Sequence, residues 1–105
     1  MISPIEGLYW HDGLLQGITL EPGEAATVVL SLALYQSSKA PARIPRRIAC
    51  EGVSRLVTSV DLKELQDNAR AGNVVDGELR GSSLWLRLTG GVVEVQAREF
   101  LLDEC

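Results

Sequence analysis

Thr27-Val28-Val29-Leu30-Ser31-Leu32-Ala33-Leu34-Tyr35 is the stretch that decides the fold of this chain. Every second position in it is aliphatic, and the positions between are mixed. Successive side chains of a β-strand point to opposite faces of the sheet, so this alternation is typical of a half-buried strand. We therefore predict a strand whose core face is formed by Val28, Leu30, Leu32 and Leu34.

A first hairpin is predicted directly before this strand. The segment 14–20 has Ile18 and Leu20 in alternating register, and Glu21-Pro22-Gly23-Glu24 follows it. Pro at the second position of a turn and Gly at the third are the signature of a type II turn. The two strands should therefore pair antiparallel.

A second hairpin is predicted near the C-terminus. Aliphatic residues alternate over 84–88 and again over 93–97, and Gly90-Gly91 lies between the two runs. A Gly-Gly pair suits a two-residue turn that needs positive φ, which would place Leu86 opposite Val95. After residue 97 the apolar phase slips to Phe100, which indicates a bulge or the end of the strand.

The middle of the chain gives weaker signals. Ile44, Ile48 and Cys50 fit one face of a strand, in which Pro45 favours an edge position, and 53–60 reads as another extended stretch. Residues 61–72 predict one short helix, with Asp61 as N-cap and Gly72 as the C-terminal stop. Residues 73–80 then return to extended structure.

These elements predict a mainly β fold with one short helix, either an antiparallel β-sandwich or a partly open barrel. The 105 residues fit a single β-rich domain spanning 1–105. No βαβ alternation, Gly-x-Gly-x-x-Gly or phosphate-loop motif is present, which argues against nucleotide binding of those kinds.

Composition and the N-terminal sequence indicate the expected cellular compartment and class of partner. No apolar run approaches the roughly 20 residues of a membrane span, and the start of the chain lacks the features of a secretory signal, so we expect a cytoplasmic protein without membrane contact. The formal net charge of −4 disfavours nucleic acid as a partner. Of the two cysteines, Cys50 should be a buried thiol and Cys105 a free terminal one, although a bridge between them is the alternative.

The run Trp10-His11-Asp12-Gly13 holds the only histidine. His11 is a potential metal ligand or general base, but adjacent residues of an extended chain point to opposite faces, so we expect Asp12 not to reach its ring. The simpler interpretation is that Tyr9 and Trp10 pack on the end of the fold while Asp12-Gly13 turns the chain into the first strand. The third interpretation is that these residues contact a partner protein.

A basic segment, 39–47, is the second candidate site. Lys39, Arg43, Arg46 and Arg47 lie among prolines and are expected on a loop, where guanidinium groups would bind carboxylates or phosphate. Charged protection of a sheet edge is the alternative.

The acidic residues form the third candidate. Asp76 and Glu78 share one face of an expected strand, while Glu94 and the Asp103-Glu104 pair lie near the C-terminus. Paired acids serve glycoside chemistry or cation binding, but a solvated face explains them equally.

The order of short motifs along the chain resembles a group of small bacterial β-rich proteins of unknown function. These motifs are Tyr9-Trp10-His11-Asp12-Gly13-Leu14-Leu15-Gln16-Gly17-Ile18, a Val/Leu-rich strand, Cys50-Glu51-Gly52-Val53, Asn73-Val74-Val75 and a last hairpin. Some relatives of that kind are encoded near polymorphic toxins and are suspected immunity proteins. The resemblance spans most of the chain through short motifs. It implies a β-rich fold and a bacterial cytosolic setting, and it carries no catalytic residues.

The sequence therefore predicts a non-enzymatic module that binds an acidic protein, with neither cofactor nor metal. The expected partner-binding residues share a basic or aromatic side chain, and they are Lys39, Arg43, Arg46, Arg47, Trp10 and His11. The alternative is a small-ligand or metal-dependent enzyme that uses His11 and nearby carboxylates.

Overall fold

The computed structural model describes residues 2–4, 8–59 and 73–104, and every regular element in them is a strand. The seven strands are β1 (Ile2–Pro4), β2 (Gly13–Glu21), β3 (Ala26–Tyr35), β4 (Arg43–Thr58), β5 (Asn73–Arg80), β6 (Ser83–Leu88) and β7 (Gly91–Glu104). The helix predicted over 61–72 lies outside the described residues.

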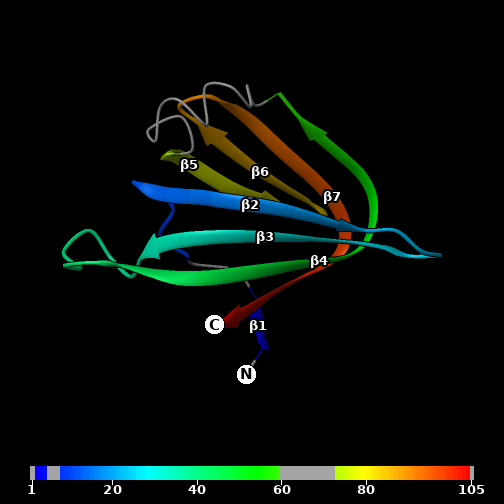
Figure 1. Ribbon diagram of the computed structural model, residues 1–105, viewed down its shortest axis with the longest axis horizontal. Helices are drawn as coiled ribbons and strands as arrows, with labels where there is room; N and C mark the ends of the chain where they lie inside the picture. Colours follow the sequence, from blue (N-terminus) through cyan, green and yellow to red (C-terminus); the bar gives the residue numbers. More distant parts are fainter. Residues whose placement is uncertain (1, 5–7, 60–72, 105) are drawn as a thin grey trace.

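The strands form one antiparallel sheet in the order β1-β7-β4-β3-β2-β5-β6, and a further pairing of β6 with β7 closes a ring of six strands. In Figure 1, β2, β3 and β4 fan out as one layer, β5 and β6 form the opposite wall, and the long β7 curves from one to the other. The mainly β class and the antiparallel arrangement are confirmed.

The ring is incomplete between β2 and β5. These strands pair only through Gly13 with Val74 and Leu14 with Asn73, after which they diverge. Of the two predicted architectures, a partly open barrel is therefore the accurate description, because the two layers remain joined along the long strands β4 and β7.

The central stretch behaves as predicted. Val28, Leu30 and Leu32 are fully buried in β3, and its neighbour strands β2 and β4 pair with it along most of its length. The first hairpin is also confirmed, with Glu21 opposite Thr27 across the turn.

The structure replaces the two extended stretches predicted over 44–60 with the single bent strand β4. At Gly52, which has a φ of 65°, the register with β3 shifts by one residue, and this is the geometry of a bulge. A side chain on Gly52 would overlap the guanidinium of Arg98. β4 as a whole lies between β3 and β7, so it is not an edge strand. Pro45 itself precedes Arg46, the first residue paired with β7 among those described, so the predicted edge position holds only for the start of β4.

The second hairpin is present with its turn one residue earlier than predicted. Leu88 pairs with Gly91, so Thr89-Gly90 forms the turn and Leu86 faces Val93 instead of Val95. The resulting shift of two positions keeps the same side chains on the core face. β7 does not end at the predicted phase slip; it exchanges β6 for β1 as its neighbour and continues to Glu104.

The core lies between the two layers. Among the described residues it contains no buried polar or charged side chain, and its fully buried large members are Leu30, Leu32, Leu34, Ile48, Leu84, Leu86, Val28, Val74, Val93, Val95 and Cys50. Burial raises the pKa of the Cys50 thiol to about 12, and this cysteine is unbridged as predicted. Over the described ranges, the chain has no helix of the length and apolarity needed to traverse a bilayer.

Candidate functional site

A tight turn, Trp10 to Gly13, leads into β2. The backbone N–H of Gly13 donates to the carbonyl of Trp10 at 3.0 Å, and that of Asp12 donates to the carbonyl of Val74 at 2.9 Å. Asp12 has a φ of 61°, a left-handed conformation that Asp tolerates better than most residues. A β-carbon on Gly13 would overlap the side chain of Leu34, so the turn is locked against the core. The predicted Asp12-Gly13 turn is confirmed.

Trp10 lies behind this turn as a packing residue. It is half-buried against the core cluster, and a β-carbon on Gly77 would come within 2.6 Å of its indole ring. Glycine at position 77 therefore lets the ring lie directly on β5, as the packing interpretation predicted.

His11 and Asp12 do contact each other, contrary to expectation. Nε2 of His11 lies 3.5 Å from Oδ2 of Asp12, and Nδ1 of the same ring lies 3.3 Å from the carbonyl oxygen of Val75. The expectation failed because it assumed an extended chain, whereas a turn brings adjacent side chains to one side. Tyr9 meets the His11 ring edge-on, with 6.4 Å between ring centroids.

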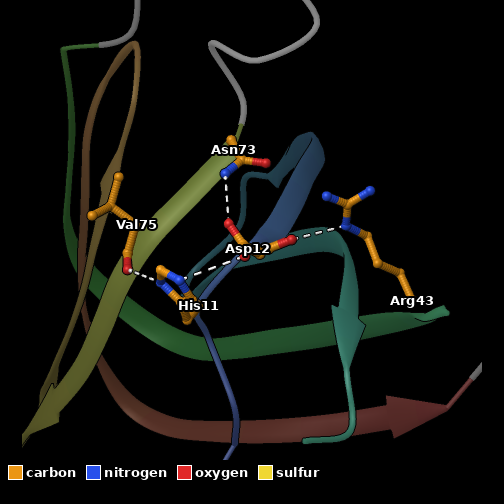
Figure 2. A network of polar contacts seen from close by, with 5 residues as sticks. All are labelled: His11, Asp12, Arg43, Asn73 and Val75. Atoms are coloured by element: carbon orange, nitrogen blue, oxygen red, sulfur yellow. Dashed lines mark hydrogen bonds and ion pairs between the residues drawn. The ribbon is translucent and has the colours of Figure 1, made fainter. Parts of the chain in front are cut away.

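Asp12 is the hub of the polar contacts (Figure 2). Its carboxylate faces His11 and accepts a 3.5 Å hydrogen bond from Nδ2 of Asn73, while its carbonyl oxygen faces the other way and accepts a 2.8 Å hydrogen bond from Nε of Arg43. One residue thus ties the first turn to β5 and to the start of β4.

Arg43 is held from two sides. Besides the bond to Asp12, its Cζ atom lies 5.1 Å from the ring centroid of Tyr35, within the range of a cation–π contact. Neither terminal nitrogen of the guanidinium forms a hydrogen bond or ion pair with the other residues drawn in Figure 2. Among the described residues no carboxylate forms an ion pair with Arg43, so its charge is not neutralised within that part of the chain.

A cleft of about 270 Å³ opens between the turn and the β3–β4 loop. We call it the arginine cleft, because Arg43 contacts two of its lining residues, Asp12 and Tyr35. Its lining is formed by Tyr9, His11, Asp12, Tyr35, Ser37, Ser38, Ala40 and Pro41. A turn within the loop, with the Ala40 N–H donating to the Ser37 carbonyl at 3.2 Å, shapes the outer wall.

The basic segment is not the single loop that the sequence predicted. Lys39 lies on the β3–β4 loop, but the three arginines belong to β4. Because side chains alternate along a strand, Arg43 and Arg47 lie exposed on one face, while Arg46 is half-buried on the face shared with Ile48 and has interactions of its own. Arg46 and Arg47 do not protect a sheet edge, since both pair with β3 and with β7, whereas Arg43 precedes the described pairing with β7.

The predicted acids do not join the cleft. Asp76 and Glu78 are exposed on β5, where Glu78 forms an ion pair with Arg80 at 2.7 Å. This hydrogen bond from Arg80 lowers the pKa of the Glu78 carboxyl below its ordinary value. Glu94 lies on β7, facing Trp85 of β6. In the ranges that the structure describes, no three His, Cys, Asp or Glu side chains converge on one point.

Sequence reasoning missed the meeting of Arg43 with Asp12 and Tyr35. A signal for it existed, because extending the predicted strand 27–35 into a hairpin across a Ser/Pro-rich loop places Tyr35 opposite Arg43. The approach of Asp12 had no local signal, since it depends on β2 and β4 flanking the same strand.

No protein-family model, curated protein or solved structure matches this chain. The resemblance to small bacterial β-rich proteins therefore stays an interpretation of short motifs.

Proposed function

We propose that the protein is a non-enzymatic binding module that recognises an acidic segment of another protein through Arg43 and the arginine cleft. The observation that carries this proposal is the guanidinium of Arg43, fixed by Asp12 and Tyr35 with both terminal nitrogens left over.

The first support is preorganisation. A flexible arginine loses side-chain entropy on binding, roughly 0.5–1.5 kcal/mol for each immobilised side chain. Arg43 is already oriented through its Nε, which leaves the two terminal amino groups to form the paired hydrogen bonds that a carboxylate accepts.

The second support is the size and lining of the cleft. Its volume of about 270 Å³ lies below the range of about 300–1,000 Å³ typical of small-molecule pockets, so it suits one or two side chains of a partner. Tyr9 and Tyr35 line it, and tyrosine and arginine are, with tryptophan, enriched among the residues that contribute most binding energy at protein interfaces.

The third support is the local field. The chain carries a net charge of −4, yet Lys39, Arg43 and Arg47 are exposed on or near one loop. The net negative charge of the protein repels acidic surfaces at long range, whereas the local cationic patch attracts an acidic partner that docks on it, which favours selective association.

The exposure of His11 and Asp12 supports binding over catalysis. Their side chains are 61% and 57% exposed, and polar groups in contact with water stabilise transition-state charge less than those in a closed site. Binding without chemistry would also fit an immunity protein, the role suspected for some of the small bacterial β-rich proteins that the sequence resembles.

The experiment is a titration of fluorescein-labelled hexaglutamate, followed by anisotropy, with hexalysine as the control peptide. We expect hexaglutamate to bind, Arg43→Ala to weaken binding, and the loss to be larger at low salt than at high salt, because rim charges are screened by ions. Arg47→Ala is the matched control, since it removes the same charge from the same face of β4 four residues away. Equal losses of hexaglutamate affinity in the two variants would show that only the net charge matters, and would contradict a specific carboxylate-binding site at Arg43.

A further inference from the structure

We propose that the outer edge of β2 is a second interaction surface, on which a second copy of this chain adds its own β2 antiparallel and forms a symmetric dimer. This surface is separate from the arginine cleft, and the proposal does not depend on it.

The edge is free of strand partners. β2 pairs with β3 from residue 14 to residue 21, but with β5 only at Gly13 and Leu14. Within the described chain, the backbone of 17–21 therefore has no strand on the side away from β3. Figure 1 shows the β2–β3 hairpin extending beyond the other strands, where a second chain has access to it.

The edge is protected only at its two ends. Proteins usually guard exposed strand edges with charged side chains, proline or a bulge, because unpaired N–H and C=O groups attract other strands. Gly17-Ile18-Thr19-Leu20 contains no charged residue or proline; the bulge in β2, between Leu15 and Gly17, comes before it, and Glu21 and Pro22 come after it. By contrast, β5 carries a bulge between Val74 and Asp76 and a row of charged residues beyond it.

Leu20 is a core-side residue that no neighbouring strand covers at this edge. It pairs with the fully buried Val28 and so stands on the core side of the sheet, yet it is 57% exposed. The cause is the divergence of β5, which would otherwise continue the wall beside it. Ile18, two residues earlier on the same face, packs partly against the core. Another strand alongside β2 would cover both side chains.

The edge is self-complementary, and this favours a second copy as the occupant. In an antiparallel pair centred on Thr19, Leu20 lies opposite Ile18 of the second copy, and Glu21 lies opposite Gly17 of the second copy. Apolar residues then meet apolar residues, and the two glutamates lie at opposite ends instead of facing each other. The result is a continuous sheet in the order β3-β2-β2-β3, with the isologous symmetry usual for dimers.

The first test measures the oligomeric state by sedimentation velocity over a concentration series. We expect a concentration-dependent dimer for the wild type and a monomer for Leu20→Lys at every concentration. Val57→Lys is the matched control, because Val57 is the other large exposed hydrophobic of the described chain and lies on β4 at 40% exposure. It should dimerise as the wild type does. A monomeric wild type, or a dimer that Leu20→Lys leaves unchanged, would overturn the proposal.

The second test fixes the register. Thr19→Cys, in a Cys105→Ser background that leaves only the buried Cys50 besides it, should form a disulfide-linked dimer under mild oxidation, since residue 19 faces itself across the two-fold axis. Ser38→Cys, an exposed position on the β3–β4 loop, is the control. Equal cross-linking rates for the two variants would overturn the arrangement.

Discussion

Removing the side chain of Leu86 should destabilise the protein by about 3–4 kcal/mol. Leu86 is fully buried on β6, where it lies between Val93 of β7 and Gly77 of β5. It therefore belongs to the wall formed by β5 and β6. The stability lost on truncating its side chain tests whether this wall and the opposite layer share one packed core.

The magnitude follows from the carbon atoms removed and the space they leave. Leu86→Ala deletes three carbons, worth about 0.8 kcal/mol each in transfer free energy, or about 2.4 kcal/mol together. The cavity left behind adds about 24 cal/mol per Å³ that the neighbours do not fill, and measured buried leucines span about 2–5 kcal/mol. Since Gly77 has no side chain to move into the space, we place Leu86 in the middle of that range.

The assay is urea denaturation followed by tryptophan fluorescence, with Val57→Ala as control. The control truncates a 40% exposed aliphatic side chain that lies outside the core and outside the proposed dimer edge, and it should cost about 0.5 kcal/mol or less. Both variants should keep the wild-type dependence on urea, because the surface exposed on unfolding hardly changes. A loss for Leu86→Ala no larger than that for Val57→Ala would refute the packing described for β6.

Three further outcomes are expected. Gly77→Ala should destabilise by about 1–3 kcal/mol and alter the fluorescence of Trp10, because the new β-carbon lies 2.6 Å from the indole; an unchanged melting curve and spectrum would disprove that contact. Cys50 should not react with a thiol reagent at pH 8 until urea is added, and stability should fall as pH rises from about 9 toward about 12, because the unfolded chain releases this proton first; rapid reaction of Cys50 in the native protein would refute its burial. Asp12→Gly should preserve stability while Asp12→Val lowers it by about 1–2 kcal/mol, since only the former tolerates a φ of 61°; equal melting temperatures would show that the turn is not left-handed.

The core strands were predictable because their signal is local. The alternation over 27–35 identified β3 and its buried face, and the same reasoning gave both hairpins and the boundaries of β5. The turn at Thr89-Gly90 was misplaced by one residue because the prediction required positive φ at both glycines, whereas only Gly91 has a positive φ, and it pairs with Leu88 as the first residue of β7. The buried face was still predicted correctly, since the register moved by two.

The errors arose where tertiary pairing decides. The unity of β4 was hidden by Gly52, which breaks the alternation but continues the strand through a bulge. The internal position of β4 depends on β7 returning beside it from far along the chain. The contact between Asp12 and Arg43 beside the arginine cleft was missed for the same reason. It depends on tertiary pairing, and no spacing in the sequence predicts the distance between these two residues.

The most direct test of the account is the side-chain Nε–H resonance of Arg43, observed by ¹⁵N NMR during addition of hexaglutamate. The fixed guanidinium should give a sharp signal in the free protein, because its Nε–H is bonded to the carbonyl of Asp12. We predict that this signal moves with the peptide concentration, together with the backbone amides of 36–40 and 42, while the Nε–H signal of Arg47 stays in place. Movement of the Arg47 signal alone, or of neither arginine, would contradict the claim that Arg43 is the built carboxylate receptor of this protein.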